Sequence, residues 1–313
     1  MIEIILSLIG GLAIMLAGAE GLVRGASALA LKVGISPLVV GLTVVAFGTS
    51  SPELVVSIGS ALEGNSDIAI GNVIGSNISN IALILGITAL INPIKINVQV
   101  IKREIPIMIA VTLIFLLMFL DLSLSRLEGA LLFAGIIFYT SISYYLSKKE
   151  NKEVEQEFEK EIPAVKGRTT TSILFVVIGF VCLAAGSNFF VNAAVEIAML
   201  FNVSQVIIGL TIVAIGTSLP ELITSIVASL KKEGDIAIGN VVGSNIFNLL
   251  SILGITAVIL PIASEGIKLI DLGMFVLTAV IMLPLARTGF VLNRWEGALL
   301  IILYIVYVYL IIP

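Results

Sequence analysis

The chain has 313 residues, of which 58% are hydrophobic and only 12% are charged. Soluble domains carry about 25% charged residues, so this composition predicts an integral membrane protein with little chain left for a soluble domain. Histidine is absent and the single cysteine, Cys182, lies in an apolar run, which excludes a disulfide framework, a thiolate metal cluster and the commonest transition-metal ligand.

Ten apolar stretches have the length of a membrane span. They lie near residues 3–31, 36–62, 67–92, 104–121, 127–146, 172–199, 204–230, 235–262, 269–286 and 295–312. The first lacks a basic start and a convincing cleavage site, so we expect it to be retained as a span. The charged segment 147–171 between the fifth and sixth stretches predicts a solvated linker with some helix. We therefore expect an all-α membrane protein with five helices in 1–146, the linker 147–171, and five helices in 172–313.

The two halves of the chain repeat each other. The run from Gly41 to Glu53 matches the run from Gly209 to Glu221, and the run from Gly71 to Asn80 matches that from Gly239 to Asn248. Each matched residue lies 168 positions after its counterpart, without a gap, which indicates duplication. Because each copy contains an odd number of spans, the second copy crosses the membrane in the opposite direction, and the repeats are predicted to be inverted.

Charges in the loops indicate the orientation. After its second span, the first copy carries Glu63 and Asp67, whereas the second copy carries Lys231 and Lys232. Positive residues mark the cytoplasmic side of membrane proteins. The pattern predicts a multi-pass protein of the cell membrane with its N-terminus outside and the central linker in the cytoplasm.

Two glutamates lie inside predicted spans that contain no lysine or arginine. A carboxylate at this depth requires compensation by a proton or a cation. Thr49 and Ser50 precede Glu53 by four and three positions, so their oxygens share one helix face, and Thr217 and Ser218 precede Glu221 in the same way. The prolines Pro52 and Pro220 are expected to break both spans and to free main-chain carbonyls for a hard cation.

The third and eighth spans supply a second set of oxygens. Ser76 and Asn80 are four residues apart, as are Ser244 and Asn248, and nearby glycines allow close helix approach. We expect four broken helices to offer carboxylate, hydroxyl, amide and carbonyl oxygens near the membrane midplane. Such a set suits Ca²⁺, which takes roughly 6–8 oxygen ligands, and the same oxygens suit Na⁺. For two further repeated pairs, Ser57 with Ser225 and Asn72 with Asn240, helix packing and a site role stay open.

These residues resemble a known family. The runs G-T-S-S-P-E at 48–53, G-T-S-L-P-E at 216–221 and G-N-V-[IV]-G-S-N at 71–77 and 239–245 are similar to the two alpha repeats of the calcium/cation antiporter superfamily, and most of all to the prokaryotic sodium/calcium exchangers. The resemblance implies that the first and sixth spans slide across the rest. It also implies a site lined by Thr49, Ser50, Glu53, Ser76, Asn80, Thr217, Ser218, Glu221, Ser244 and Asn248, with carbonyls of Ala46 and Ala214.

The expected function is therefore exchange of Na⁺ for Ca²⁺ by alternating access. Many relatives carry an aspartate in place of Asn248, which leaves the ion stoichiometry and any potassium dependence open. Proton-coupled or potassium-dependent cation exchange is the alternative, and a channel is a further rival. The lack of histidine, of a base for a serine nucleophile and of a nucleotide-binding loop argues against an enzyme. We expect no cofactor, no nucleic-acid partner, and a monomer in the lipid bilayer whose ligands are the transported ions.

Overall fold

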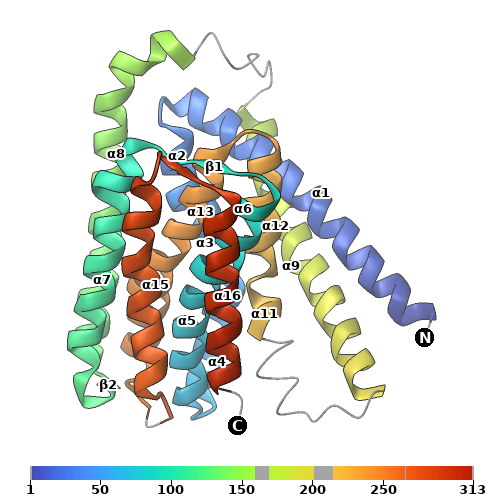
Figure 1. Ribbon diagram of the computed structural model, residues 1–313, viewed down its shortest axis with the longest axis vertical. Coiled ribbons are helices and arrows are strands. Elements are labelled where there is room, and N and C mark those ends of the chain that lie inside the picture. The colour runs from blue at the N-terminus through green and yellow to red at the C-terminus, as the bar shows by residue number, and fades with distance from the viewer. Residues whose placement is uncertain (1, 159–168, 201–213, 265, 312–313) are drawn as a thin grey trace.

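The computed structural model describes residues 2–158, 169–200, 214–264 and 266–311 (Figure 1). The first half contains α1 (Ile2–Val33), α2 (Pro37–Val40), η1 (Gly41–Val45), α3 (Ala46–Thr49), α4 (Ser51–Leu62), α5 (Ser66–Ser79), η2 (Asn80–Leu85), α6 (Gly86–Ile91), β1 (Ile94–Lys95), η3 (Val100–Glu104), α7 (Ile105–Met118), η4 (Phe119–Asp121), β2 (Ser123–Leu124) and α8 (Arg126–Phe158). The second half contains α9 (Thr169–Leu200), α11 (Ala214–Thr217), α12 (Leu219–Leu230), α13 (Gly234–Phe247), η6 (Asn248–Leu253), α14 (Gly254–Ile259), β3 (Ile262–Ala263), α15 (Leu269–Arg287), β4 (Val291–Leu292) and α16 (Arg294–Ile311).

The fold is helical and has the character of a membrane protein. Eight described helices are long and apolar enough to cross a membrane, and the bent pair 37–49 and 51–62 makes a ninth candidate span. The stretch predicted near 204–230 lies partly outside the described residues, and its described part comprises α11 and α12. Helix α8 continues to Phe158, so the described beginning of the predicted linker is helical, as expected; residues 159–168 lie outside the description.

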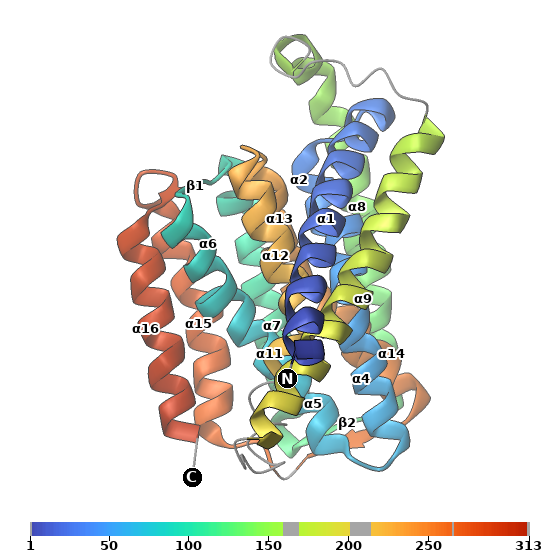
Figure 2. The same ribbon diagram turned by 90° about the vertical axis from the view of Figure 1, so that its right-hand side faces the viewer.

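The third and eighth spans form the centre of the bundle. In Ser66–Ile91 and Gly234–Ile259, 72% and 83% of the most apolar stretch is buried inside the protein, against at most 39% for the other long helices. Figures 1 and 2 show α5 and α13 surrounded by the remaining helices. A helix with so little lipid contact can carry polar side chains at low cost, so the core of this bundle is where polar groups are tolerated.

The described residues contain four strands of two residues each, and these form two pairings between loops of opposite halves. β1 pairs with β4, with Ile94 opposite Leu292, and β2 pairs with β3, with Leu124 opposite Ile262. Ile94 and Ile262 are 168 positions apart, and so are Leu124 and Leu292. The β1–β4 pairing therefore has the same register as the β3–β2 pairing, with each strand replaced by its equivalent from the other half. The internal sequence repeat is therefore also present in how the two halves contact each other.

Helices α1 and α9 pack side by side (Figures 1 and 2), and in Figure 1 they lie obliquely to the upright bundle. Glycines line the seam between them, because a Cβ on Gly11 would lie 2.7 Å from the carbonyl oxygen of Gly186, and one on Gly18 would lie 2.9 Å from that of Gly179. Small residues let membrane helices approach at the backbone, where dispersion contacts are densest. The seam therefore holds α1 and α9 together as one unit.

A methyl group added to this seam is expected to destabilise the protein. Gly11→Ala forces the two backbones apart, because its Cβ would also lie 2.8 Å from the backbone nitrogen of Phe190. Overpacking of this kind costs about 1–3 kcal/mol. The neighbouring Gly10→Ala is the matched control, since nothing in the described structure lies within 4 Å of its added Cβ. Thermal unfolding of the two purified variants measures the difference, and equal unfolding temperatures would contradict the close packing.

Candidate cation site

The second span breaks where its proline predicts. Helix α3 ends at Thr49, Ser50 has φ −84° and ψ 6°, and α4 begins at Ser51 with Pro52 in its first turn. The two parts meet at an angle of 45°. The seventh span repeats the break at Ser218, with φ −91° and ψ 5°, between α11 and α12. The prediction of broken helices is confirmed for these two spans.

Each break places a glutamate in the first turn of a half-helix. Glu53 and Glu221 lie in the first turns of α4 and α12, where the free backbone N–H groups favour negative charge. Both side chains are buried, with 1% and 0% exposure. The half-helix dipoles therefore offset part of the cost of burying two carboxylates.

The hydroxyl groups beside the glutamates cross between the halves. Ser50 donates to Oε1 of Glu221 over 2.8 Å, and Ser218 donates to Oε1 of Glu53 over 3.3 Å. The helix spacing predicted that Ser50 and Glu53 share a face of one helix, but the hydrogen bonds join each serine to the glutamate of the other repeat. The two carboxylates thus belong to one site rather than two.

The third and eighth spans are not broken, which corrects the expectation of four broken helices. Each stays continuous but widens into a π-helical turn that begins at a candidate ligand, η2 at Asn80 and η6 at Asn248. Such turns are common at functional sites because they shift side chains out of the regular helix register. The close helix approach predicted for glycines holds for Gly239 and Gly243, whose added Cβ atoms would lie 2.9 Å from Leu38 O and 2.6 Å from Leu42 O.

Five buried oxygens at this place have no hydrogen-bond partner among the described residues. They are Oε2 of Glu53, Oε2 of Glu221, Oδ1 of Asn80, Oδ1 of Asn248 and Oγ of Ser244. A buried oxygen without a partner costs about 1–3 kcal/mol, more when it is charged, so five of them in one region require a reason. Carboxylate, amide and hydroxyl oxygens are ligands for hard cations, so a cation is a suitable partner for oxygens of these kinds.

The remaining predicted site residues take different positions. Thr49, Ser50, Ser76 and Ser218 are buried, whereas Thr217 is half-buried and faces a cavity. The carbonyl oxygen of Ala46 accepts hydrogen bonds from Ser50 N (3.0 Å) and from Thr49 Oγ1 (3.3 Å). Ala214 is the first residue of α11, and its side chain lies outside the described residues.

The two repeated pairs whose role the sequence left undecided, Ser57 with Ser225 and Asn72 with Asn240, form hydrogen bonds next to the broken helices. The amide nitrogen of Asn72 donates to Ser57 Oγ (2.9 Å) and to the main-chain carbonyl of Glu53 (3.1 Å), and that of Asn240 donates to Ser225 Oγ (3.0 Å) and to the carbonyl of Glu221 (3.3 Å). Both asparagines hold the backbone of a glutamate rather than its carboxylate. Helix-to-helix hydrogen bonding is thus the role that the contacts support for these pairs.

Two functional candidates were missed by sequence reasoning. Asn77 and Asn245 are buried and contact Asn248 and Asn80, and they belong to the repeated G-N-x-x-G-S-N run. Their repetition at the constant offset was the available signal. In the part of the chain that the structure describes, no three Asp, Glu, His or Cys side chains come together, so the site depends on neutral oxygens as well as on its two acids.

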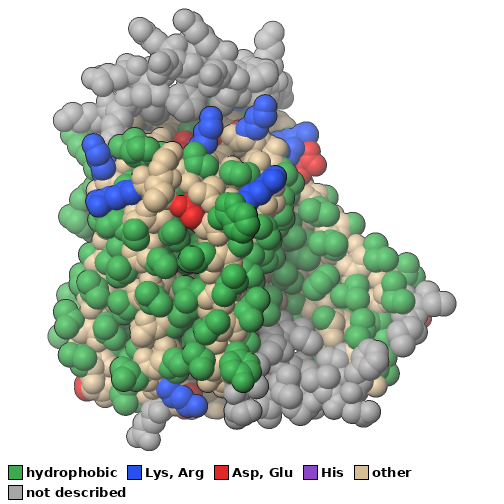
Figure 3. All heavy atoms as spheres, viewed as in Figure 1, with side chains coloured by type: hydrophobic (Ala, Val, Ile, Leu, Met, Phe, Trp, Pro, Cys, Tyr) green, Lys and Arg blue, Asp and Glu red, His purple; other side chains and the backbone are tan. Residues whose placement is uncertain are grey.

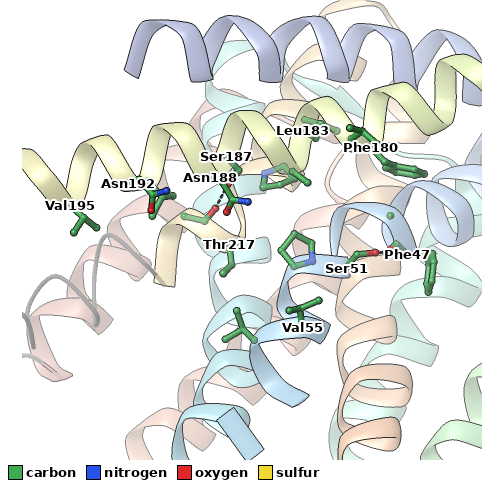
Figure 4. Close-up of a pocket in the computed structure, with 18 residues that line it drawn as sticks. Phe47, Ser51, Val55, Phe180, Leu183, Ser187, Asn188, Asn192, Val195 and Thr217 are labelled. Carbon is green, nitrogen blue, oxygen red and sulfur yellow. Dashed lines mark hydrogen bonds between the residues drawn. The ribbon is translucent and has the colours of Figure 1, made fainter. Parts of the chain in front are cut away.

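A cavity of about 840 Å³ lies against both breaks (Figure 4). It is lined by Gly48 and Pro52 on one side, by Gly216 and Thr217 on another, and by α9. From α9, Ser187 donates to the carbonyl oxygen of Gly216 over 2.8 Å. The ring of Phe180 packs so closely on Gly48 that an added Cβ would lie 1.9 Å from it. Helix α9 therefore contacts the broken spans of both halves.

Comparison with known proteins shows a family match over both halves of the chain. The model of the family described as sodium/calcium exchanger protein matches residues 3–145 and again 171–312. The chain is 41% identical over 306 residues to the putative antiporter CaxA of Alkalimonas amylolytica, covering 96% of each protein. It is 31% identical over 337 residues to the sodium/calcium exchanger MaX1 of Methanosarcina acetivorans, again covering 96% of each.

Solved structures of the sodium-calcium exchanger NCX_Mj are similar over the whole fold. One superposes with a TM-score of 0.85 at 29% identity and covers 99% of both chains. The matched family and relatives are exchangers and antiporters, which confirms the prediction that the chain is a transporter of cations and not an enzyme. The resemblance that the two repeated motifs carry is therefore correct: this multi-span membrane protein belongs to the sodium/calcium exchanger family.

Proposed function

We propose that the protein is a secondary active antiporter that exchanges Na⁺ for Ca²⁺ at one site near the membrane midplane. The observation that carries the proposal is the pair of buried glutamates, Glu53 and Glu221, each with one unpartnered carboxylate oxygen. Two negative charges balance one Ca²⁺, and the neutral oxygens around them complete a ligand set that Na⁺ can also use. Two ions that share ligands exclude each other, which is what exchange requires.

The site in this proposal consists of the twelve predicted residues. They are Ala46, Thr49, Ser50, Glu53, Ser76, Asn80, Ala214, Thr217, Ser218, Glu221, Ser244 and Asn248. No cofactor takes part. The cavity beside α9 is the outer route to this site, because its lining continues from the breaks to Val55 and Val195, on helix segments that run toward the predicted outer face.

Ten spans in two inverted repeats are part of the proposal. The match of one family model to both 3–145 and 171–312 supports the division into 1–146, a linker and 172–313. The exchanged register of the two short strand pairs supports an approximate two-fold axis. In such folds, alternating access moves one group of helices against the rest around a fixed site. The α1–α9 unit is that group here.

The orientation follows from charge. Figure 3 shows lysine and arginine side chains gathered mostly near the upper end, from which α8 extends, with a broad hydrophobic surface below them. The positive-inside rule makes this end cytoplasmic. We therefore place the linker in the cytoplasm, the N-terminus outside, and the protein, as a monomer, in the plasma membrane.

Calcium flux under separately imposed gradients tests the proposal. In proteoliposomes loaded with Na⁺, uptake of radiolabelled Ca²⁺ is expected when the outside lacks Na⁺, and little uptake is expected when Na⁺ is equal on both sides. Protein-free liposomes are the control. Uptake driven by a pH gradient without Na⁺ would replace Na⁺ coupling by proton coupling, and a requirement for K⁺ would show potassium-dependent exchange. Ion conductance far above carrier turnover would contradict an antiporter.

A further inference from the structure

Four asparagines form a hydrogen-bonded chain between the two halves, in the order Asn80, Asn245, Asn77, Asn248. Asn80 Nδ2 donates to Asn245 Oδ1 over 3.0 Å, and Asn248 Nδ2 donates to Asn77 Oδ1 over 2.9 Å. Asn77 Nδ2 donates to the main-chain carbonyl of Asn245 (3.2 Å), and Asn245 Nδ2 donates to that of Asn77 (3.3 Å). All four side chains are buried, with at most 2% exposure. This asparagine chain therefore joins α5–η2 to α13–η6 in the core of the bundle.

In each hydrogen-bonded pair, Asn80 with Asn245 and Asn248 with Asn77, the two side-chain amides have different partners. In Asn77 and Asn245, both the oxygen and the nitrogen have protein partners, and Asn245 Nδ2 also lies 3.7 Å from the sulfur of Met108. In Asn80 and Asn248, the nitrogen has a partner but Oδ1 has none among the described residues. Asn77 and Asn245 are thus occupied by protein contacts, whereas Asn80 and Asn248 keep their oxygens for another ligand.

An asparagine has to be oriented to serve as a cation ligand. Its side chain ends in an oxygen acceptor and an NH₂ donor of nearly the same shape, and a rotation by 180° about the last bond exchanges them. A flipped amide would present N–H hydrogens to the cation and would be repelled. An acceptor that captures the NH₂ group fixes the orientation, as partners beyond the direct ligands commonly do at metal sites.

We propose that Asn77 and Asn245 are positioning residues, which direct the side-chain oxygens of Asn248 and Asn80 toward the transported cation. Each acts on the ligand of the other repeat, so the site forms only when the two halves are in register. This inference rests on the proposed site, because it assigns a role in cation binding to residues that do not contact the cation themselves.

A carboxylate at the ligand position removes the need for orientation. Aspartate has two equivalent oxygens and no N–H, so in an Asn248→Asp protein Asn77 has no amide group to hold. Asn77→Leu, which is close to asparagine in size, is therefore expected to raise the apparent KM for Ca²⁺ about tenfold in the wild-type background, equivalent to about 1.4 kcal/mol. In the Asn248→Asp background it is expected to raise the KM less than twofold. This double-mutant cycle isolates the pairwise term.

The asparagine chain supplies its own controls. Asn245→Leu in the Asn248→Asp background is expected to keep its full effect, because Asn245 holds Asn80. The mirrored cycle, Asn245→Leu with Asn80→Asp, gives an independent second test. Asn77→Asp keeps the acceptor for Asn248 Nδ2 but loses the N–H that donates to the main-chain carbonyl of Asn245, so its KM is expected to lie between those of the wild type and Asn77→Leu. The Ca²⁺-induced rise in unfolding temperature of each purified variant reports binding where flux is too low to measure.

The outcomes separate the two proposals. Wild-type protein without Ca²⁺ flux or Ca²⁺-dependent stabilisation would overturn the proposed function itself. Wild-type flux together with equal effects of Asn77→Leu in the wild-type and Asn248→Asp backgrounds would overturn the positioning role, because a purely structural contact would act alike in both. An effect confined to the wild-type background, repeated in the mirrored cycle, supports it.

Discussion

Replacing either Glu53 or Glu221 by glutamine is expected to abolish Ca²⁺ flux. Glutamine keeps the shape and one oxygen of the side chain but removes the charge. Because both positions are buried, each variant leaves a divalent ion with a single acidic ligand in a buried site. Loss of one partner of a buried charge pair costs about 3–5 kcal/mol, which weakens binding by roughly two to four orders of magnitude.

Uptake of radiolabelled Ca²⁺ into Na⁺-loaded proteoliposomes measures this effect. Glu63→Gln is the matched control, since Glu63 caps the other end of α4 and is exposed, and its flux is expected to equal that of the wild type. Equal elution volumes in size-exclusion chromatography would show that the variants are folded. Wild-type flux in either Glu53→Gln or Glu221→Gln would remove these residues from the site.

The sequence was sufficient to predict that both acids are buried next to breaks in their spans. A glutamate in an apolar span has few explanations, and the same glutamate repeated 168 residues later, with the same Thr-Ser pair and proline, has fewer still. The breaks at Ser50 and Ser218 follow from a local rule, because a proline removes a helix hydrogen bond wherever it stands. Features set by one residue and its immediate neighbours were therefore predictable.

The contacts between the halves were not predictable from the sequence. Helix periodicity tells which residues share a face of one helix, so it placed Ser50 with Glu53, but it does not tell what that face meets. The pairing of Ser50 with Glu221, and of Asn77 with Asn248, depends on how two distant segments pack. The π-helical turns at Asn80 and Asn248 have the same origin, since their register is a result of packing rather than of a local signal.

Removing the cation is expected to reverse the stability order of the wild type and the Glu53→Gln/Glu221→Gln double variant. In Na⁺-free buffer with a calcium chelator, the wild type keeps two acidic side chains buried in one site without a cation to balance them, and the double variant does not. Neutralising buried, unbalanced charge is stabilising, so the double variant is expected to unfold at a temperature several degrees higher. This result would mean that the two glutamates lower the stability of the transporter when no cation is bound.

Calcium is expected to restore the opposite order. A ligand that binds only the folded state at 100 times its Kd stabilises that state by about 2.7 kcal/mol, and this gain is available to the wild type alone. Thermal unfolding in detergent, measured for both proteins with chelator and with Ca²⁺, gives the four values needed. A wild type that is the more stable protein in chelator, or a double variant that gains as much from Ca²⁺ as the wild type, would contradict a site whose charge balance depends on the transported ion. Because this measurement needs no gradient and no movement of helices, it tests binding separately from transport.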